Sequence, residues 1–180
     1  MAEHSDGPPP RGIAARLASR SGARFALVAL AAGGLAAGLA ARGAPARRAA
    51  PALPARVLSG PPVTIADLRG RPAALVFWAT WCNPCRAEAG AVEAVARAVA
   101  GHARVVGIDY SDSGDWRGFV RAHGWTFPVL ADPNGATLDA YGITVGIPAT
   151  VIVDSGGRIA AIRYGAQRAP ALRAALAAAG

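Results

Sequence analysis

Residues 73–88 carry the sequence Ala-Ala-Leu-Val-Phe-Trp-Ala-Thr-Trp-Cys-Asn-Pro-Cys-Arg-Ala-Glu. The first six of them, 73–78, are entirely apolar and predict a strand buried on both faces. Beyond them, valines recur at helical spacing between charged residues, up to a closing glycine, which predicts a helix over 83–100. The two cysteines of the chain, Cys82 and Cys85, are therefore expected where a buried strand ends and a helix begins.

The rest of the domain is expected to complete an α/β fold. Residues 104–109 follow the helix and predict a second buried strand, which gives a parallel pair with a right-handed crossover. Two further runs, 149–154 and 158–164, are joined by Ser-Gly-Gly and predict an antiparallel hairpin. The remaining predicted elements are helices at 115–123, 136–141 and 169–179 and a strand at 127–130. The sequence thus predicts a mixed central sheet flanked by helices.

The two cysteines point to redox chemistry. A structural zinc site needs four ligands, and none of the three histidines is spaced as a partner pair. A purely structural disulfide between Cys82 and Cys85 would close a very small loop and restrict the unfolded chain little. A redox-active disulfide fits the pair better, and we expect neither a metal nor a cofactor.

The two cysteines are expected to divide the work. Unpaired N–H groups and the positive end of the helix dipole favour the thiolate of Cys82, which is therefore the expected nucleophile and should be exposed. Cys85, one turn further into the helix, should be more buried and resolve the mixed disulfide. Pro84 suits an early helical position because it has no N–H to leave unpaired.

The amino-terminal part of the chain differs in composition. Residues 1–24 form an arginine-rich leader, and 25–41 contain no charge. This run predicts a transmembrane anchor, or else a secretory signal cleaved near residue 44. Residues 42–56, rich in Ala, Pro and Arg, are interpreted as a linker, and the folded domain is expected at 57–180.

All 19 basic residues are arginine, and the chain has a formal net charge of +8. The excess of positive charge is greatest around the uncharged run at 25–41. The domain itself shows neither a basic stripe nor a recognisable nucleic-acid-binding motif, so we expect no nucleic-acid partner.

Residues 77–88 resemble the active-site signature of membrane-anchored, thioredoxin-like proteins of the TlpA/ResA type. The resemblance covers roughly 68–164 and includes Phe-Pro-Val-Leu-Ala-Asp at 127–132 and Gly-Ile-Pro-Ala-Thr at 146–150. It implies a thioredoxin-like fold, with the domain on the extracytoplasmic side of the membrane and residues 1–24 in the cytoplasm.

The resemblance also implies roles for four more residues. Pro148 would be a cis proline that faces the disulfide and aligns a substrate strand, and Ile147 would offer its backbone to the substrate. Glu88 would influence the proton transfers of the cysteines, although a plain solvated carboxylate on the helix is the alternative. Trp81 would border the substrate groove. The proline that often follows the family acid is replaced here by Ala89.

These features predict a thiol-disulfide oxidoreductase that acts on exported proteins, as a reductase in cytochrome c maturation or a related pathway. Its expected partners are an apocytochrome c or other exported disulfide and a membrane thiol electron donor. The alternatives are a general disulfide oxidase or isomerase, a thiol peroxidase, and a Cu(I)-handling module, since soft thiolates select that ion.

Overall fold

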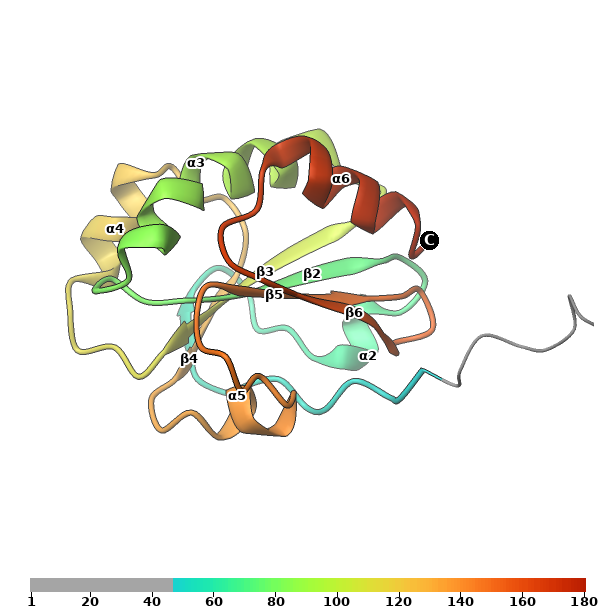
Figure 1. The fold of residues 1–180 in the computed structure, drawn as a ribbon, viewed down its shortest axis with the longest axis horizontal. Coiled ribbons are helices and arrows are strands. Elements are labelled where there is room, and N and C mark those ends of the chain that lie inside the picture. The colour runs from blue at the N-terminus through green and yellow to red at the C-terminus, as the bar shows by residue number, and fades with distance from the viewer. Residues whose placement is uncertain (1–46) are drawn as a thin grey trace, which may run out of the picture. The chain divides into compact units, whose positions relative to one another are not determined.

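The computed structural model describes residues 47–180, which form one six-stranded sheet between two layers of helices (Figure 1). The strand order is β1-β4-β3-β2-β5-β6. Strands β2, β3 and β4 run parallel to one another, whereas β1, β5 and β6 are antiparallel to their neighbours. The strands are β1 (Val57–Ser59), β2 (Ala73–Trp78), β3 (Arg104–Tyr110), β4 (Val129–Asp132), β5 (Ala149–Val153) and β6 (Ile159–Tyr164). The predicted mixed sheet is confirmed.

Helices cover both faces of the sheet. Figure 1 shows α3, α4 and α6 on one face and α2 and α5 on the other. Their bounds are α2 (Ile65–Leu68), α3 (Asn83–Ala98), α4 (Trp116–Ala122), α5 (Ala136–Ala140) and α6 (Ala169–Ala177). This arrangement gives the thioredoxin-like α/β fold that the sequence predicts.

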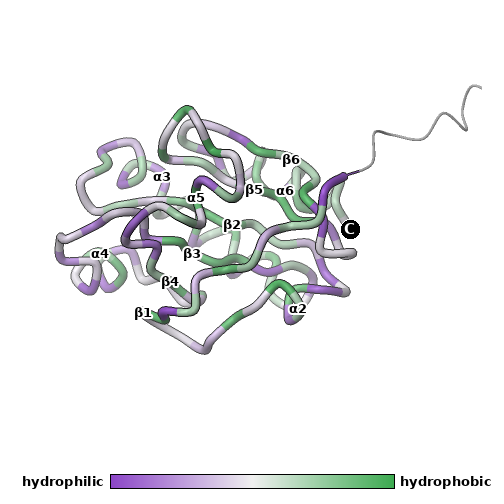
Figure 2. The backbone as a smooth tube through the Cα atoms, turned by 90° about the horizontal axis from the view of Figure 1, so that it is seen from below, coloured by the Kyte–Doolittle hydropathy of each residue, from purple (hydrophilic) through white to green (hydrophobic). Residues whose placement is uncertain are grey.

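Strand β2 connects the two cores of the domain. Its side chains alternate between the core under α3 and α6, which takes Ala74, Val76 and Trp78, and the core under α2 and α5. Alternation of this kind follows from the two-residue period of a strand. All six residues of β2 are buried, and hydrophobic residues concentrate on the central strands (Figure 2). The strand is therefore fixed from both sides, and so is the loop that follows it.

Three local features differ from the sequence expectations. Strand β4 lies two residues later than predicted, because Pro128 has no N–H for the sheet and Val129 makes the first pairing with β3. Strand β1 and helix α2 are additional. A capping box starts α2, in which Thr64 and Asp67 bond each other's backbone N–H groups.

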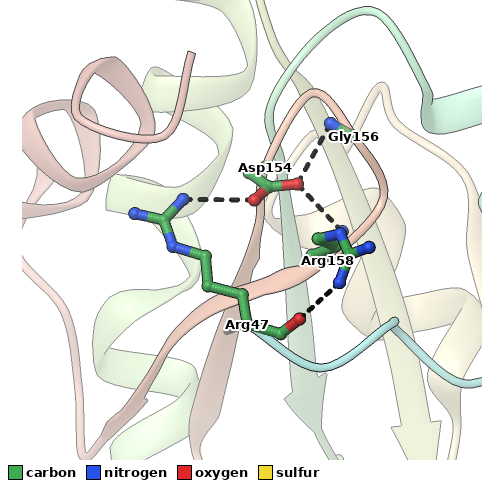
Figure 3. Close-up of polar contacts among 4 residues, drawn as sticks. All are labelled: Arg47, Asp154, Gly156 and Arg158. Carbon is green, nitrogen blue, oxygen red and sulfur yellow. Dashed lines mark hydrogen bonds and ion pairs between the residues drawn. The ribbon is translucent and has the colours of Figure 1, made fainter. Parts of the chain in front are cut away.

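Residues 47–56, which the sequence assigns to the linker, lie along the domain and are hydrogen-bonded to it. Ala49 forms a β-bridge with Arg158, and the Arg158 guanidinium donates to the Arg47 carbonyl at 2.7 Å. Asp154 accepts from Arg47 at 3.1 Å and from the N–H groups of Gly156 and Arg158 (Figure 3). The extended backbone of this segment is therefore hydrogen-bonded to the β5–β6 turn.

The predicted membrane-spanning run, 25–41, lies outside the described residues. Among the helices of residues 47–180, none combines the length and the apolar character needed to cross a membrane.

Candidate active site

Cys82 and Cys85 form a disulfide at the first turn of α3, with their sulfur atoms 2.04 Å apart and their Cα atoms 5.3 Å apart. Cys82 is the N-cap of the helix, and its sulfur accepts the backbone N–H of Cys85 at 3.2 Å. Pro84 occupies the first turn, as predicted. The predicted junction of buried strand and helix start is thus confirmed, and it directs unpaired helix N–H groups toward the sulfur of Cys82.

The prediction that Cys82 is exposed is wrong for this oxidised state. Its relative exposure is 4%, against 1% for Cys85, and both belong to the core under α3. Cys82 packs into the cluster that contains Trp78 and Ala79, and Ile147 covers the same cluster. Trp81, Asn83 and Pro84 are the exposed residues of the motif, and 55% of the surface of Trp81 is accessible.

The peptide bond between Ile147 and Pro148 is cis, as the resemblance implies. Pro148 directly precedes β5, and the first residue of that strand, Ala149, pairs with Phe77 near the end of β2. This register brings the cis proline to the edge of the sheet from which the cysteine loop emerges. Ile147 packs against both cores. The roles of these two residues toward a substrate stay predictions.

Glu88 is buried on α3, with a relative exposure of 3%, so the alternative of a solvated carboxylate is wrong. Its Oε2 accepts the backbone N–H of Gln167 at 2.7 Å, and its Oε1 has no hydrogen-bond partner among residues 47–180. Burial raises the pKa of Glu88 to about 7, against the opposing effect of the Gln167 N–H. A carboxyl with this pKa, one helical turn from Cys85, can hold or release a proton near neutral pH.

The loop before Cys82 is held by residues that the sequence does not predict. The N–H and hydroxyl of Thr80 donate to the carboxylate of Asp112, and the Thr80 carbonyl accepts from Arg86. The Trp81 indole donates to the Ser111 carbonyl at 3.4 Å. The β3–α4 segment therefore contacts both residues before the cysteine. An Asp placed after a strand is too common a signal to have identified it.

A cleft of about 350 Å³ opens beside this loop. It runs between α3 and α4 and is lined by polar and apolar side chains, among them Thr80, Arg86, Asp115, Phe119 and His123. The cleft touches the loop through Thr80, but neither cysteine lines it, and neither do Trp81, Ile147 and Pro148.

Comparison with known proteins gives a consistent result. The model of the AhpC/TSA family matches residues 46–162. The thioredoxin-like protein YneN of Bacillus subtilis is 34% identical over 120 residues, which cover 64% of this chain and 69% of YneN. The thiol-disulfide oxidoreductase ResA of Oceanobacillus iheyensis is 34% identical over 116 residues, or 58% of this chain and 55% of ResA.

Among solved structures, a secreted disulfide oxidoreductase of Mycobacterium tuberculosis, described as homologous to Escherichia coli DsbE, matches with a TM-score of 0.60. It is 31% identical, and the match covers 70% of this chain and 95% of the solved chain. The sequence-based resemblance to the ResA type is confirmed by these relatives.

Proposed function

The chain belongs to the AhpC/TSA family of thioredoxin-like proteins, and on this premise we propose that it reduces disulfides of exported proteins through Cys82 and Cys85. The observation that carries the proposal is the disulfide at the start of α3, at the same end of the sheet as the cis peptide of Pro148. The names of its relatives, thiol-disulfide oxidoreductases, support the reaction class.

The reaction uses two thiol–disulfide exchanges. In the reduced protein, the Cys82 thiolate attacks one sulfur of a substrate disulfide, which forms a mixed disulfide and releases a substrate thiolate. The Cys85 thiolate then attacks the Cys82 sulfur, closes the disulfide seen in the structure and releases the second substrate thiolate. Two electrons pass to the substrate, and the two leaving thiolates take up two protons.

Glu88 takes the proton of Cys85 before the second exchange. Its raised pKa supports this role, because a carboxylate of pKa about 7 is basic enough to accept a thiol proton. Trp81 and the backbone of Ile147 border the bound substrate strand, and Pro148 aligns it. A membrane dithiol protein returns the pair to its reduced state by the reverse exchanges.

The proposed organisation follows the sequence. Residues 1–24 form a cytoplasmic leader and 25–41 a transmembrane anchor. Residues 42–56 connect the anchor to the domain and lie along it from residue 47 on. Residues 57–180 act on the extracytoplasmic side. The description of the M. tuberculosis relative as secreted supports this compartment. The proposed substrate is the haem-binding cysteine pair of an apocytochrome c, supported by the resemblance to the ResA type.

Trapping of the mixed disulfide tests the function. In a Cys85→Ala variant of the full chain, Cys82 attacks but cannot be released, so the substrate stays covalently bound. Membranes are isolated first, where the anchor should retain the chain, and the trapped proteins are identified by mass spectrometry. The matched control is the Cys82→Ala, Cys85→Ala double variant, which should trap nothing.

The identity of the trapped proteins decides between the alternatives. Capture of a cytochrome precursor supports the proposed substrate, whereas many unrelated exported proteins indicate a general oxidase or isomerase. If the single variant traps no more than the double variant, and the reduced protein instead turns over peroxide, the chain is a thiol peroxidase.

A further inference from the structure

Thr80, two residues before Cys82, has every polar group bound. Its hydroxyl donates to Oδ1 of Asp112 at 2.7 Å, and its backbone N–H donates to Oδ2 of the same carboxylate. Its carbonyl accepts from Nε of Arg86 at 2.9 Å. Asp112 lies 32 residues along the chain from Thr80, so this contact joins two separate loops. The segment that leads into the nucleophile is thereby held from both sides.

The β3–α4 loop is shaped for this contact. Asp112 also accepts the N–H of Gly114 at 2.8 Å, and a Cβ atom at Gly114 would collide with the Thr80 hydroxyl. Ser111 has a positive φ of 45°, a conformation uncommon for residues other than glycine. Backbone of this kind persists where surrounding contacts determine it. The loop is therefore built to bring Asp112 close to Thr80.

A second carboxyl lies behind the first. Asp109 is buried near the end of β3, in register with Trp78, and its Oδ1 has no hydrogen-bond partner within the described part of the chain. Burial, the charge of Asp112 and a hydrogen bond to it raise the pKa of Asp109 to about 7, and only Arg56 opposes this. Two adjacent carboxyls do not both ionise readily. Asp109 is therefore the member of the pair that holds a proton more readily, and in its protonated form it can donate a hydrogen bond to Asp112.

The pKa of Asp112 agrees with this assignment. Burial would raise it, but hydrogen bonds from the N–H groups of Thr80 and Gly114 and from the Thr80 hydroxyl hold it below its ordinary value. Asp112 is thus the ionised member of the pair. A carboxylate that accepts several hydrogen bonds makes a strong and directional anchor.

We propose that Asp112 is a positioning residue for Cys82: supported by Asp109, it fixes Thr80 and so holds the loop that sets the cysteine opposite Cys85. This inference rests on the proposed redox function of the pair. A fixed loop keeps the two sulfur atoms within bonding reach and so raises the effective concentration of each cysteine relative to the other. Loss of the anchor should make the disulfide less favourable without removing either cysteine.

The test measures the equilibrium between the Cys82–Cys85 disulfide and dithiothreitol in the full chain. Asp112→Ala should lower the equilibrium constant for disulfide formation by about tenfold, or about 30 mV for a two-electron couple, since small misplacements cost this much. No physiological substrate is needed, so this experiment can succeed or fail independently of the trapping experiment.

Asp154→Ala is the matched control. Asp154 also accepts hydrogen bonds from two backbone N–H groups and from one side chain (Figure 3). It follows the last residue of β5, whereas Pro148 precedes the first residue of that strand. Five residues of strand span about 17 Å, so Asp154 is remote from the disulfide. This variant should lose stability and keep the wild-type redox equilibrium.

Substitutions of the two partners separate positioning from folding. Thr80→Val removes the hydroxyl but preserves the shape of the side chain, so it should lower the equilibrium constant for disulfide formation as Asp112→Ala does. Thr80→Ser keeps the hydroxyl and should have the wild-type equilibrium constant. Asp109→Asn keeps a donor toward Asp112 and should resemble the wild type. If folded Asp112→Ala or Thr80→Val stays within twofold of the wild type, or if Asp154→Ala shifts the equilibrium equally, the proposal is overturned.

Discussion

Replacing Glu88 by glutamine should change how the stability of the protein depends on pH. The carboxyl has an ordinary pKa of 4.5, and burial raises it to about 7 in the folded chain. Between these values the folded state holds a proton that the unfolded chain releases, so the wild type loses stability as the pH rises. The difference of about 2.5 pKa units corresponds to about 3 kcal/mol, fully lost above pH 7.

Glutamine keeps an oxygen for the Gln167 N–H and cannot ionise. The free energy of unfolding of Glu88→Gln, relative to the wild type, should therefore increase by about 3 kcal/mol between pH 4.5 and pH 8. Denaturant unfolding of the oxidised protein across this range measures the increase. A difference that stays flat would refute the assignment of a raised pKa to Glu88.

Asp67→Asn serves as the control for this experiment. Hydrogen bonds from the hydroxyl and the backbone N–H of Thr64 lower the pKa of Asp67. The stability that Asp67 contributes is therefore present above its ordinary pKa of 3.8 and is lost only as the pH falls through the lowered value. From pH 4.5 to pH 8, the offset between this variant and the wild type should remain constant.

Two further predictions concern stability alone. Tyr141→Phe removes the hydrogen bond of 2.8 Å from the phenol to the Pro51 carbonyl, and should lower the free energy of unfolding by about 1 kcal/mol. Gly135→Ala should cost at least about 1 kcal/mol, because φ is +75° and the new Cβ would lie 2.9 Å from the Tyr110 ring. Denaturant unfolding checks both, and a neutral result would contradict the corresponding contact.

The sequence predicts the elements whose signals are local. Residues 73–78 are an unbroken apolar run, and 149–153 are apolar except for Thr150; both are central strands in the structure. Strand β1 has three residues, which is too few for a recognisable pattern. Helix α2 could have been found from its capping box, because Thr64 stands three residues before Asp67.

Within the site, too, the residues with a local sequence signal are predicted and those that depend on tertiary contacts are not. Cys82 and Cys85 are identified by a motif of four consecutive residues. The burial of Glu88 depends on Gln167, 79 residues later, and helical spacing alone leaves its side chain open to interpretation. The bond between Thr80 and Asp112 likewise joins segments that only the folded sheet brings together. Tertiary contacts between distant loops leave no periodic trace in the sequence.

Because the side chains of β2 alternate between two cores, the codons for this strand should not tolerate insertions or deletions. A three-base deletion within the codons for residues 73–78 would keep the reading frame and yet exchange the side chains of the two cores along the rest of the strand. It would also turn the following loop, with its cysteines, toward the opposite layer of helices. The number of residues in this stretch should therefore stay fixed over generations.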